Sequence, residues 1–562
     1  MSAPWRVKTQ DAQMRAALAG RLKVSQILAQ LLLNRGMEDA GLARDFLLAD
    51  RKALLDPFLF RDMGAAVGRI RQAIAGNEKI MLYGDYDVDG ITGTVLLHSI
   101  LERLKASLMI YIPHRIREGY GLHDEPIRLA KEQGVGLMIT IDCGTSESKR
   151  IREARRMGMD TIIVDHHEAK GELPDEALAF LNPKAPHETY PFRHLTSVGV
   201  AFKLACALVD AQSAAAYLDL VALGTVADVA PLVGENRVLV RQGLEAIAKT
   251  SNRGLRSLIQ AASIRARRFT TDHLGFMLGP RINASGRMGS GMRAFRLLTT
   301  GDAHEADHLA RELNEENLSR QKLERQVNQE AVERVEGRCD FSSERVLVVW
   351  GEGWHLGVVG IVASKLVERY QRPALVIGME GERGRGSGRS IPQFDLLGSL
   401  DRCGSHLVRY GGHAQAVGLE ISRDELVPFR EAINREVRTR LSAEGLSFFT
   451  DIDMEIKLDA LTKQTLNELE QLAPYGLNNP RPQFLSSELT VLSDPVPVGR
   501  EGIRFWVEGE GAVGEGLVFK CQDSARGLKR GARVDLVYTP ELDVWDGKEK
   551  LKLVVKDLKP CE

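Results

Sequence analysis

Three short acidic segments, each directly after an apolar run, constrain the fold of this chain more than any other feature. They are residues 83–90 (YGDYDVDG), 141–144 (IDCG) and 164–167 (VDHH). The preceding runs, residues 79–82, 137–141 and 161–164, are short and rich in β-branched residues, which is typical of buried parallel strands. Stretches with helical periodicity lie between them, so the pattern predicts βαβ units and an α/β fold.

The carboxyl ends of parallel strands meet at one edge of a sheet, and ligands collect there. The acidic side chains would repel one another at that edge unless cations neutralise them. Carboxylate oxygens and imidazole together suit magnesium or manganese. The sequence therefore predicts a two-metal phosphoester hydrolase.

Simpler interpretations exist for each segment taken alone. Asp85, Asp87, Asp89 and Gly90 have the spacing of a calcium loop, but the glutamate expected at its twelfth position is Leu96. The other acidic segments could be a helix cap and a hydrogen-bonded turn. A fourth segment, residues 224–232 (GTVADVAPL), weakens these interpretations, because its aspartate is flanked by apolar residues and a buried unpaired carboxylate is costly.

The order of the motifs GDYDVDG, IDCGTS, DHH, GTVADVAPL, RINASGRMG, GSGRS and GGHAQAVG resembles the DHH phosphoesterase superfamily. Within it, the chain is most similar to the RecJ-type exonucleases specific for single-stranded DNA. The resemblance implies a parallel-sheet DHH catalytic domain and a second α/β lobe of the DHHA1 type, joined by a long helix. A C-terminal OB-like β-barrel would complete the fold.

At 562 residues the chain exceeds what one hydrophobic core serves. The expected organisation is a helical lead-in over residues 1–75, the DHH domain over 76–300 and a connector helix over 301–340. The DHHA1-type domain would span residues 341–445 and the OB-like domain residues 450–562. Phe505, Trp506 and Trp545 of the last domain could stack on bases or belong to its core.

The resemblance also implies the roles of individual residues. Two Mn²⁺ or Mg²⁺ ions would clamp the scissile phosphate, with Asp142 bridging them. Four residues before Asp87, where the pyrophosphatases of the superfamily have a histidine ligand, this chain has Tyr83, so Asp85 could take over its metal. Asp85 and Asp165 are either ligands or orient their neighbours, and His167 would hydrogen-bond the phosphate. The implied metal ligands are Asp87, Asp89, Asp142, His166 and Asp228.

The substrate would be held from both lobes. Arg115 and Tyr120 are candidates for the terminal 5′ phosphate. Glycines in residues 384–390 and 411–413 could let backbone N–H groups approach a phosphate, although flexible turns are the simpler interpretation of glycine-rich segments. Between residues 253 and 296 there are nine arginines and one acidic residue, Asp272, which favours a phosphate-facing surface over a solvated helix face. By resemblance, Ser387, Arg389, His413 and Arg287 contact nucleotide phosphate.

The expected activity is 5′ to 3′ hydrolysis of single-stranded DNA into mononucleotides, in DNA repair and recombination. The alternatives are a DHH nanoRNase or phosphatase acting on short oligonucleotides, and a DNA-binding subunit without activity. The expected partners are single-stranded DNA, single-stranded-DNA-binding protein and a DNA helicase. The formal net charge of −1 is less basic than is usual for a nucleic-acid binder. Six scattered cysteines and the lack of a long apolar run predict a cytoplasmic protein without a membrane span. We expect a monomer.

Overall fold

The computed structural model of the chain describes residues 4–115, 117–169, 171–440, 449–499, 502–519, 527–545 and 548–561. The chain divides into two compact units. The larger unit comprises residues 57–228 and 246–448, and the smaller comprises residues 1–56, 229–245 and 449–562. Every residue predicted to bind metal or phosphate lies in the larger unit, so the candidate site belongs to one compact body.

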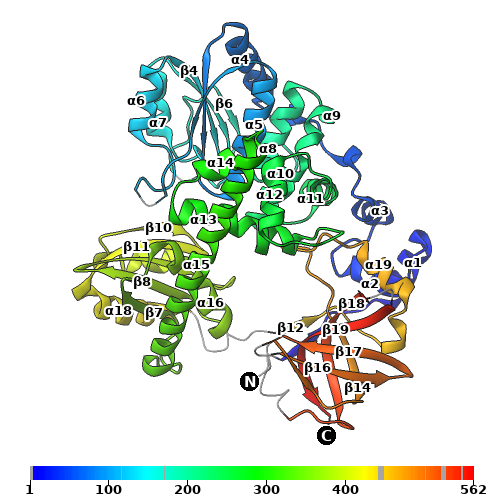
Figure 1. Cartoon of the computed structure of the whole chain (residues 1–562). Helices are drawn as coiled ribbons and strands as arrows, with labels where there is room; N and C mark the ends of the chain where they lie inside the picture. Colours follow the sequence, from blue (N-terminus) through cyan, green and yellow to red (C-terminus); the bar gives the residue numbers. More distant parts are fainter. Residues whose placement is uncertain are drawn as a thin grey trace. The chain divides into compact units, whose positions relative to one another are not determined.

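A five-stranded parallel sheet is the centre of the first lobe of the larger unit (Figure 1). Its order is β3 (Ser107–Tyr111), β2 (Lys79–Gly84), β4 (Val135–Ile141), β5 (Asp160–Val164) and β6 (Ala179–Leu181). The three predicted strands are confirmed. Because β2 pairs with β3 on one side and β4 on the other, the strand order reverses at β2, and a ligand crevice forms at the carboxyl ends beside such a point.

Helices cover both faces of this sheet (Figure 1). On one face, α6 (Asp124–Glu132) and α7 (Ser148–Arg156) pack against β2, β4 and β5 through a buried apolar cluster. On the other face, α5 (Val88–Arg103), α8 (Ser197–Leu208) and α10 (Leu218–Ala227) pack together. The strands are therefore apolar on both sides, which explains why they appear in the sequence as continuous apolar runs.

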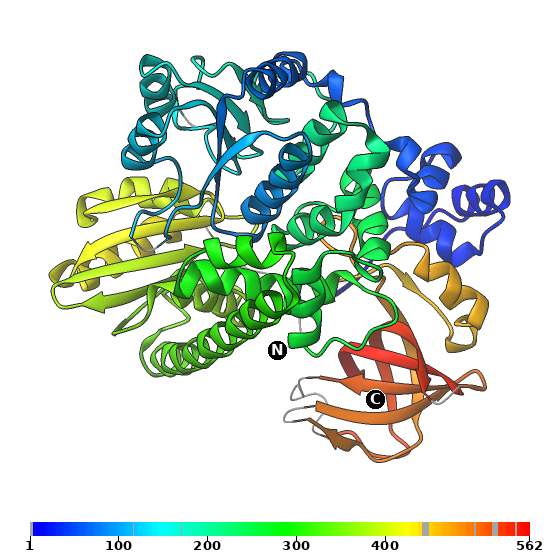
Figure 2. The same ribbon diagram turned by 45° about the horizontal axis from the view of Figure 1, so that its top comes forward.

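The predicted long helix is α15 (Ala303–Arg338), 36 residues in length. It packs against the catalytic lobe through α12 (Arg253–Ala261), α13 (Gly279–Met288) and α14 (Met292–Thr299). It also packs against α16 (Leu356–Tyr370) of the second lobe; in Figure 2 it is the long green helix beside the yellow-green strands. One helix thus holds both lobes of the larger unit.

The second lobe is built on a mixed five-stranded sheet in the order β10, β11, β9, β8, β7. One face packs on α17 (Leu396–Arg402) and α18 (Leu426–Arg438). The strands span β7 (Leu347–Glu352), β8 (Ala374–Glu380), β9 (Arg383–Arg389), β10 (Arg409–His413) and β11 (Ala416–Ser422).

The glycine-rich segments at 384–390 and 411–413 are therefore mainly strands and not phosphate-binding loops. The backbone of β9 is paired on both sides, with β8 and with β11, so its N–H groups are not available to a phosphate. A Cβ atom on Gly388 would lie 2.5 Å from a Leu375 methyl carbon and 2.6 Å from one of Val417. These glycines serve close packing of the sheet, and the segment presents arginine side chains on its other face.

The smaller unit contains the predicted OB-like barrel. Strands β14 (Phe484–Val491), β18 (Arg533–Trp545), β19 (Lys548–Pro560), β17 (Ala512–Val518) and β16 (Gly502–Gly509) pair in this order, and β16 pairs back with β14 to close the barrel. Phe505 is 1% exposed and belongs to the barrel core, which is the second of the two roles predicted for it. Trp506 is half-buried, and the side chain of Trp545 lies outside the described residues.

The N-terminal helices α1 (Ala12–Leu22), α2 (Gln26–Leu33) and α3 (Ala40–Leu48) share a hydrophobic core with α19 (Lys463–Glu470) and the barrel. The Arg237 guanidinium, 1% exposed, donates hydrogen bonds to the backbone carbonyls of Phe46, Gln471 and Leu472. Of the helices in the described ranges, none alone has the length and apolar composition of a membrane span; α1 and α2 reach them only as a pair bent by 113°.

Candidate functional site

The acidic side chains of the candidate site follow the carboxyl ends of β2, β4 and β5. Asp87 caps the N-terminus of α5, where its Oδ1 accepts hydrogen bonds from the backbone N–H groups of Asp89 and Gly90. Asp142 has a left-handed backbone (φ 64°), which turns the chain sharply after β4. Both carboxyl oxygens of Asp89 accept backbone N–H groups at the start of α8, from Ser197 at 2.8 Å and Val198 at 2.9 Å.

One group of potential metal ligands surrounds the His166 imidazole. Its Nε2 lies 3.4 Å from Oδ1 of Asp142, 3.7 Å from Oδ2 of Asp228 and 3.8 Å from Oδ2 of Asp89. This Nε2 is buried, and no hydrogen-bond partner for it exists among the described residues. Three carboxylates from three elements thus converge on one unsatisfied ring nitrogen.

A second group of potential ligands is formed by Asp85, Asp87 and Asp142, whose nearest oxygens all lie within 4.8 Å of one another. Oδ1 of Asp85 is buried and has no hydrogen-bond partner within the described residues. Asp142 is common to this group and the one around His166. The structure therefore brings all the predicted metal ligands, and also Asp85, into two adjoining groups.

Burial and mutual repulsion make these carboxylates a favourable environment for cations. Burial, followed by the charges of neighbouring aspartates, raises the pKa of Asp89 to about 7 and that of Asp142 well above the usual range. The pKa values of Asp85 and Asp228 are raised for the same two reasons. Burial and the neighbouring His167 charge lower the pKa of His166 to about 3, so its ring is neutral and able to ligate a metal. The donor set thus fits divalent cations such as Mn²⁺ and Mg²⁺.

Asp165 has a different environment from the other carboxylates. Its Oδ1 accepts the backbone N–H of His166 at 2.7 Å and lies 2.8 Å from Nδ1 of His167. Burial would raise the pKa of Asp165, but the hydrogen bond and charge of His167 outweigh it and lower that pKa. Burial opposes protonation of His167, yet Asp165 raises its pKa to about 9. These contacts orient both histidines.

The Tyr120 hydroxyl also contacts this cluster. It donates to the backbone carbonyl of Asp142 at 3.0 Å and lies 3.1 Å from Nδ1 of His167. The side chain is nevertheless 49% exposed. Tyr120 can therefore offer its ring, more than its hydroxyl, to a substrate.

A cavity of about 600 Å³ between the two lobes brings together most of the predicted phosphate ligands. Ser387 and Arg389 lie on the face of β9 that α16 packs against. Gly360 of α16 allows their close approach, because a Cβ there would lie 3.1 Å from the Ser387 hydroxyl. Arg115 and Arg287 line the cavity from the first lobe. His413 lies two strands away from Arg389, through Ala416, and is not among the residues that line this cavity.

Burial and mutual repulsion lower the pKa values of two arginines of this cavity. Burial first, and then the charges of Arg115, Arg320 and Arg389, lower the pKa of Arg287 to about 9. Burial and Arg115 likewise lower the pKa of Arg389. Mutual repulsion of this kind is relieved when an anion binds between the cations, so the cavity is suited to a phosphate.

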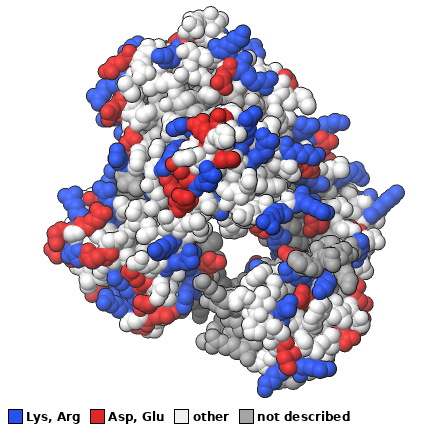
Figure 3. Space-filling model, in the orientation of Figure 1, with Lys and Arg blue, Asp and Glu red and all other residues white. Residues whose placement is uncertain are grey.

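Two other arginines of residues 253–296 are paired with acidic side chains and are not free to face a phosphate. Arg293 pairs with Glu316 at 2.5 Å and Arg296 with Glu305 at 2.5 Å, both on α15. The acidic partners come from outside the sequence window, which is why the window alone suggested an unbalanced charge. On the face drawn in Figure 3, positive and negative side chains are likewise interspersed.

Ser197 is a residue of the site that the sequence did not predict. Its hydroxyl donates to Oδ1 of Asp142 at 2.8 Å, and its backbone N–H holds Asp89. The only signal was a helix start of the type Thr-Ser-Val-Gly at residues 196–199. Nothing in this signal connected the helix to the acidic segments, because the contact spans 55 residues of sequence.

Comparisons with known proteins place these observations in a family. The DHH family N-terminal domain matches residues 79–225, the DHHA1 domain residues 343–439 and the RecJ OB domain residues 452–557. The single-stranded-DNA-specific exonuclease RecJ of Bacillus subtilis is 37% identical over 557 residues, which cover 98% of this chain and 70% of that protein. RecJ of Dickeya dadantii is 34% identical over 91% of this chain and 92% of the relative.

Solved structures agree with this assignment. The crystal structure of RecJ in complex with Mn²⁺ from Thermus thermophilus superposes with a TM-score of 0.81 at 28% identity, covering 100% of this chain and 80% of that chain. Its complex with Mg²⁺ gives a TM-score of 0.79. The predicted fold class, with its DHH, DHHA1 and OB domains, is confirmed. The chain belongs to the RecJ family of single-stranded-DNA-specific exonucleases.

Proposed function

We propose that this chain is a metal-dependent exonuclease that hydrolyses single-stranded DNA from the 5′ end into mononucleotides, in DNA repair and recombination. The observation that carries the proposal is the position of the acidic groups beside the arginine-lined cavity. Arg115 interacts electrostatically with Asp85, and Arg287 with Asp87. A phosphodiester held by the arginines would thus lie next to the metal ligands. The RecJ relatives, named as single-stranded-DNA-specific exonucleases, support the same activity.

We assign one metal position to Asp89, His166 and Asp228 and a second to Asp85 and Asp87, with Asp142 shared by both. Two Mn²⁺ or Mg²⁺ ions held there would supply the Lewis acidity that phosphodiester hydrolysis needs. Asp165 acts as an orienting residue, because it holds the backbone N–H of His166 and the Nδ1 proton of His167.

His167 is proposed to stabilise negative charge on the scissile phosphate. Its pKa of about 9 keeps the ring protonated at neutral pH. Its side chain is 45% exposed, so Nε2 can donate to a phosphate oxygen while Asp165 holds Nδ1. A charged donor already in position strengthens as charge develops on the phosphate.

Arg115, Arg287, Ser387 and Arg389 are proposed to bind the terminal 5′ phosphate, and the exposed ring of Tyr120 to contact the terminal nucleoside. His413 lies two strands away from Arg389 on the same face of the second sheet, and we propose that it contacts a different phosphate of the bound DNA. Arg389 donates to the Ser387 hydroxyl at 2.9 Å, which fixes its guanidinium before substrate binds. Such preorganisation reduces the entropy lost on binding.

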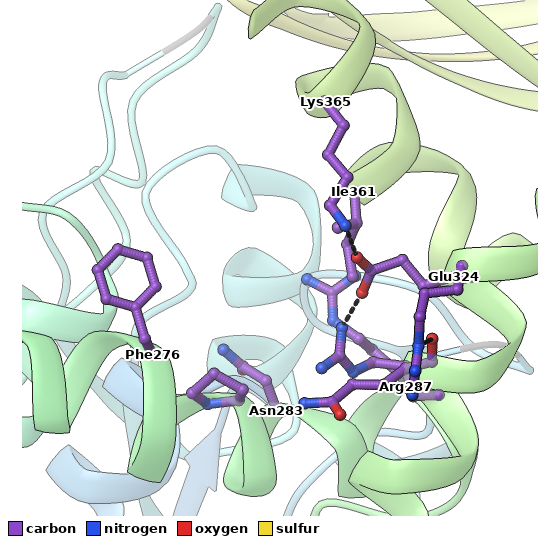
Figure 4. A pocket seen from close by; sticks show the side chains of 10 residues that line it. Phe276, Asn283, Arg287, Glu324, Ile361 and Lys365 are labelled. Atoms are coloured by element: carbon purple, nitrogen blue, oxygen red, sulfur yellow. Dashed lines mark hydrogen bonds and ion pairs between the residues drawn. The ribbon is translucent and has the colours of Figure 1, made fainter. Parts of the chain in front are cut away.

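The rest of the strand is proposed to run through a second cavity of about 460 Å³, which shares Arg287 with the first (Figure 4). Glu324 in its wall is neutralised by Arg320 and Lys365, each at 2.5 Å. Opposite them Phe276 is 78% exposed. Basic groups with an exposed aromatic ring are typical of single-strand binding, because every base offers a face for stacking.

The wider assignments follow from the family. We propose domains at residues 76–300, 301–340, 341–445 and 450–562 after the lead-in of residues 1–75. We also propose a cytoplasmic monomer that works with single-stranded-DNA-binding protein and a DNA helicase. The RecJ OB domain match at 452–557 disfavours the nanoRNase alternative, since that activity needs only the two catalytic lobes.

A time course on one oligonucleotide, labelled in turn at each end, tests the activity and its direction. With Mn²⁺, a 5′ label should appear at once as mononucleotide, while a 3′ label should pass through progressively shorter strands. A blunt duplex of the same sequence is the control and should persist. Immediate release of the 3′ label, or equal attack on the duplex, would contradict the proposal.

A further inference from the structure

The cavity between the lobes carries more positive charge than one terminal phosphate needs. Six arginines line it against two glutamates: Arg115, Arg117, Arg287, Arg385, Arg389 and Arg409, with Glu118 and Glu420. Both glutamates already have partners. Glu118 accepts hydrogen bonds from the Tyr111 hydroxyl and the His114 backbone, and Glu420 pairs with Arg383 at 3.4 Å.

The register of the second sheet places the residues of its strands in rows of cross-strand neighbours. Arg385, Glu420 and Arg409 are direct neighbours across β9, β11 and β10, and the row of Ser387, Gly418 and Gly411 runs parallel to it. Residues two apart in a strand face the same side and lie about 7 Å from each other. Arg385 and Arg409 therefore lie one row beyond Ser387, on the same face as the proposed phosphate contacts.

The space above these rows is open. A Cβ atom on Gly411 or on Gly418 would meet no atom within 4 Å, so the cavity floor in the Ser387 row is bare backbone. Among the described residues, no hydrogen bond or ion pair to protein engages the guanidinium of Arg385 or of Arg409. The two cations flank an open floor next to the phosphate position proposed at Ser387 and Arg389.

We propose that Arg385 and Arg409 form a second phosphate subsite, which takes a phosphate group beyond the one held by Ser387 and Arg389. The inference rests on the proposed function, because it assumes that the 5′ end of a strand enters this cavity. Two sources can supply such a group. One is the outer phosphates of a 5′-triphosphorylated end; the other is one more nucleotide at the 5′ side, in which case the protein would release dinucleotides.

The test compares three strands of one sequence that carry a 5′-hydroxyl, a 5′-monophosphate or a 5′-triphosphate. KM and product length are measured with the protein in the presence of Mn²⁺. Binding of each strand is measured separately by fluorescence anisotropy, with Ca²⁺ in place of Mn²⁺. The variants are Arg385→Gln, Arg409→Gln and the double variant. Arg402→Gln is the matched control, because Arg402 pairs with Glu436 at 2.7 Å in the same lobe, outside the cavity.

If the outer phosphates are the ligand, the triphosphorylated strand should bind at least about tenfold more tightly than the monophosphorylated one, the usual range for charge-assisted hydrogen bonds. That ratio should fall to about one in the double variant and persist in the control. If the source is a further nucleotide, dinucleotides should be released by the unmodified protein and disappear in the double variant.

Equal affinity for the two phosphorylated ends together with mononucleotide products only would overturn the subsite, as would unchanged ratios in the double variant. Failure of the proposed function is a different result. In that case the unmodified protein would hydrolyse none of the three strands, while the anisotropy ratio still reports on the subsite.

Discussion

The acidic centre and the arginine cavity are electrostatic opposites within one compact unit. In the acidic centre, burial raises the pKa of four carboxyls, those of Asp85, Asp89, Asp142 and Asp228. In the cavity, burial lowers the pKa of Arg287 and Arg389. In each region like charges lie close together and repel one another. A bound ion of opposite charge would reduce this repulsion in either region.

The two regions differ in the kind of ligand that can reduce this repulsion. The acidic centre offers oxygens and a neutral imidazole, which suit small divalent cations. The cavity offers guanidinium groups, which suit the planar, bidentate contacts of a phosphate. Binding and chemistry should therefore be separable by mutation, although the two regions adjoin.

The largest effect should follow Asp142→Ala, because Asp142 is shared by both ligand groups. Turnover under saturating Mn²⁺ should fall by about 10³-fold or more, since loss of the metal contribution removes several kcal/mol of transition-state stabilisation. Binding of a 5′-phosphorylated strand should persist. Steady-state kinetics and anisotropy measure the two properties.

The control for Asp142→Ala is Asp175→Ala, an exposed carboxylate elsewhere in the same lobe. It should retain full activity. If the Asp142 variant kept its turnover, or lost binding and turnover equally, the separation of the two regions would be disproved.

The opposite pattern is expected for Arg389→Ala. A charged hydrogen bond contributes about 1.5 to 3 kcal/mol, so affinity for the strand should fall by about 10- to 150-fold. Mn²⁺ affinity, measured by calorimetry, should not change. Arg389→Lys should restore only part of the affinity, because an ammonium cannot make the forked contact. A loss of Mn²⁺ binding would place Arg389 with the acidic centre instead.

The acidic centre was predictable from sequence because its signal is local. A strand and the residue after it are contiguous, and parallel strands necessarily deliver Asp87, Asp142 and His166 to one edge. The long helix was predictable for the same reason, since α15 has interleaved leucines and no proline over its length.

The arginine cavity was only partly predictable because it depends on pairing between distant segments. The sequence could not tell that Gly386 and Gly388 are packed strand positions, or that Glu305 and Glu316 neutralise the nearby arginines. It also gave no sign that residues 4–56 share a core with the barrel. A chain cut near residue 450 would consequently expose that core, so removing the barrel alone is not a clean experiment.

A smaller effect is expected for Ser197→Ala, which removes the hydroxyl that holds Oδ1 of Asp142 at 2.8 Å. The backbone N–H groups that hold Asp89 remain. Loss of such an orienting contact lowers metal affinity or activity by about 10- to 100-fold, and we expect the lower end. A Mn²⁺ titration of activity measures the change. Ser364→Ala on α16 is the control, and equal Mn²⁺ affinity in both variants would exclude an orienting role for Ser197.

The smallest expected effect is a shift of a few degrees in melting temperature with pH, and it concerns the acidic centre alone. A carboxyl whose pKa is raised on folding favours the folded state below its unfolded pKa, and this contribution is lost as pH rises through the folded value. For Asp89 the loss runs from about pH 4 through about 7, and Asp85, Asp142 and Asp228 act in the same direction.

The other titrating groups in the centre do not reverse this slope. The lowered pKa of His166 opposes the slope up to about pH 6.5, but it is one group against four carboxyls. Asp165 has a lowered pKa, so its contribution is present above about pH 4. The raised pKa of His167 gives stability below about pH 6.5 that is lost as pH rises through about 9. The melting temperature of the metal-free protein should therefore fall between pH 5 and pH 8. Mn²⁺ displaces the protons bound to these carboxyls, so the stabilisation by Mn²⁺ should grow between pH 5 and pH 8. Calorimetry with EDTA and with Mn²⁺ measures both trends, and Asp142→Asn should flatten them. A Mn²⁺ effect as large at pH 5 as at pH 8 would mean that the carboxylates are already ionised without metal, and the contrast with the arginine cavity would then fail.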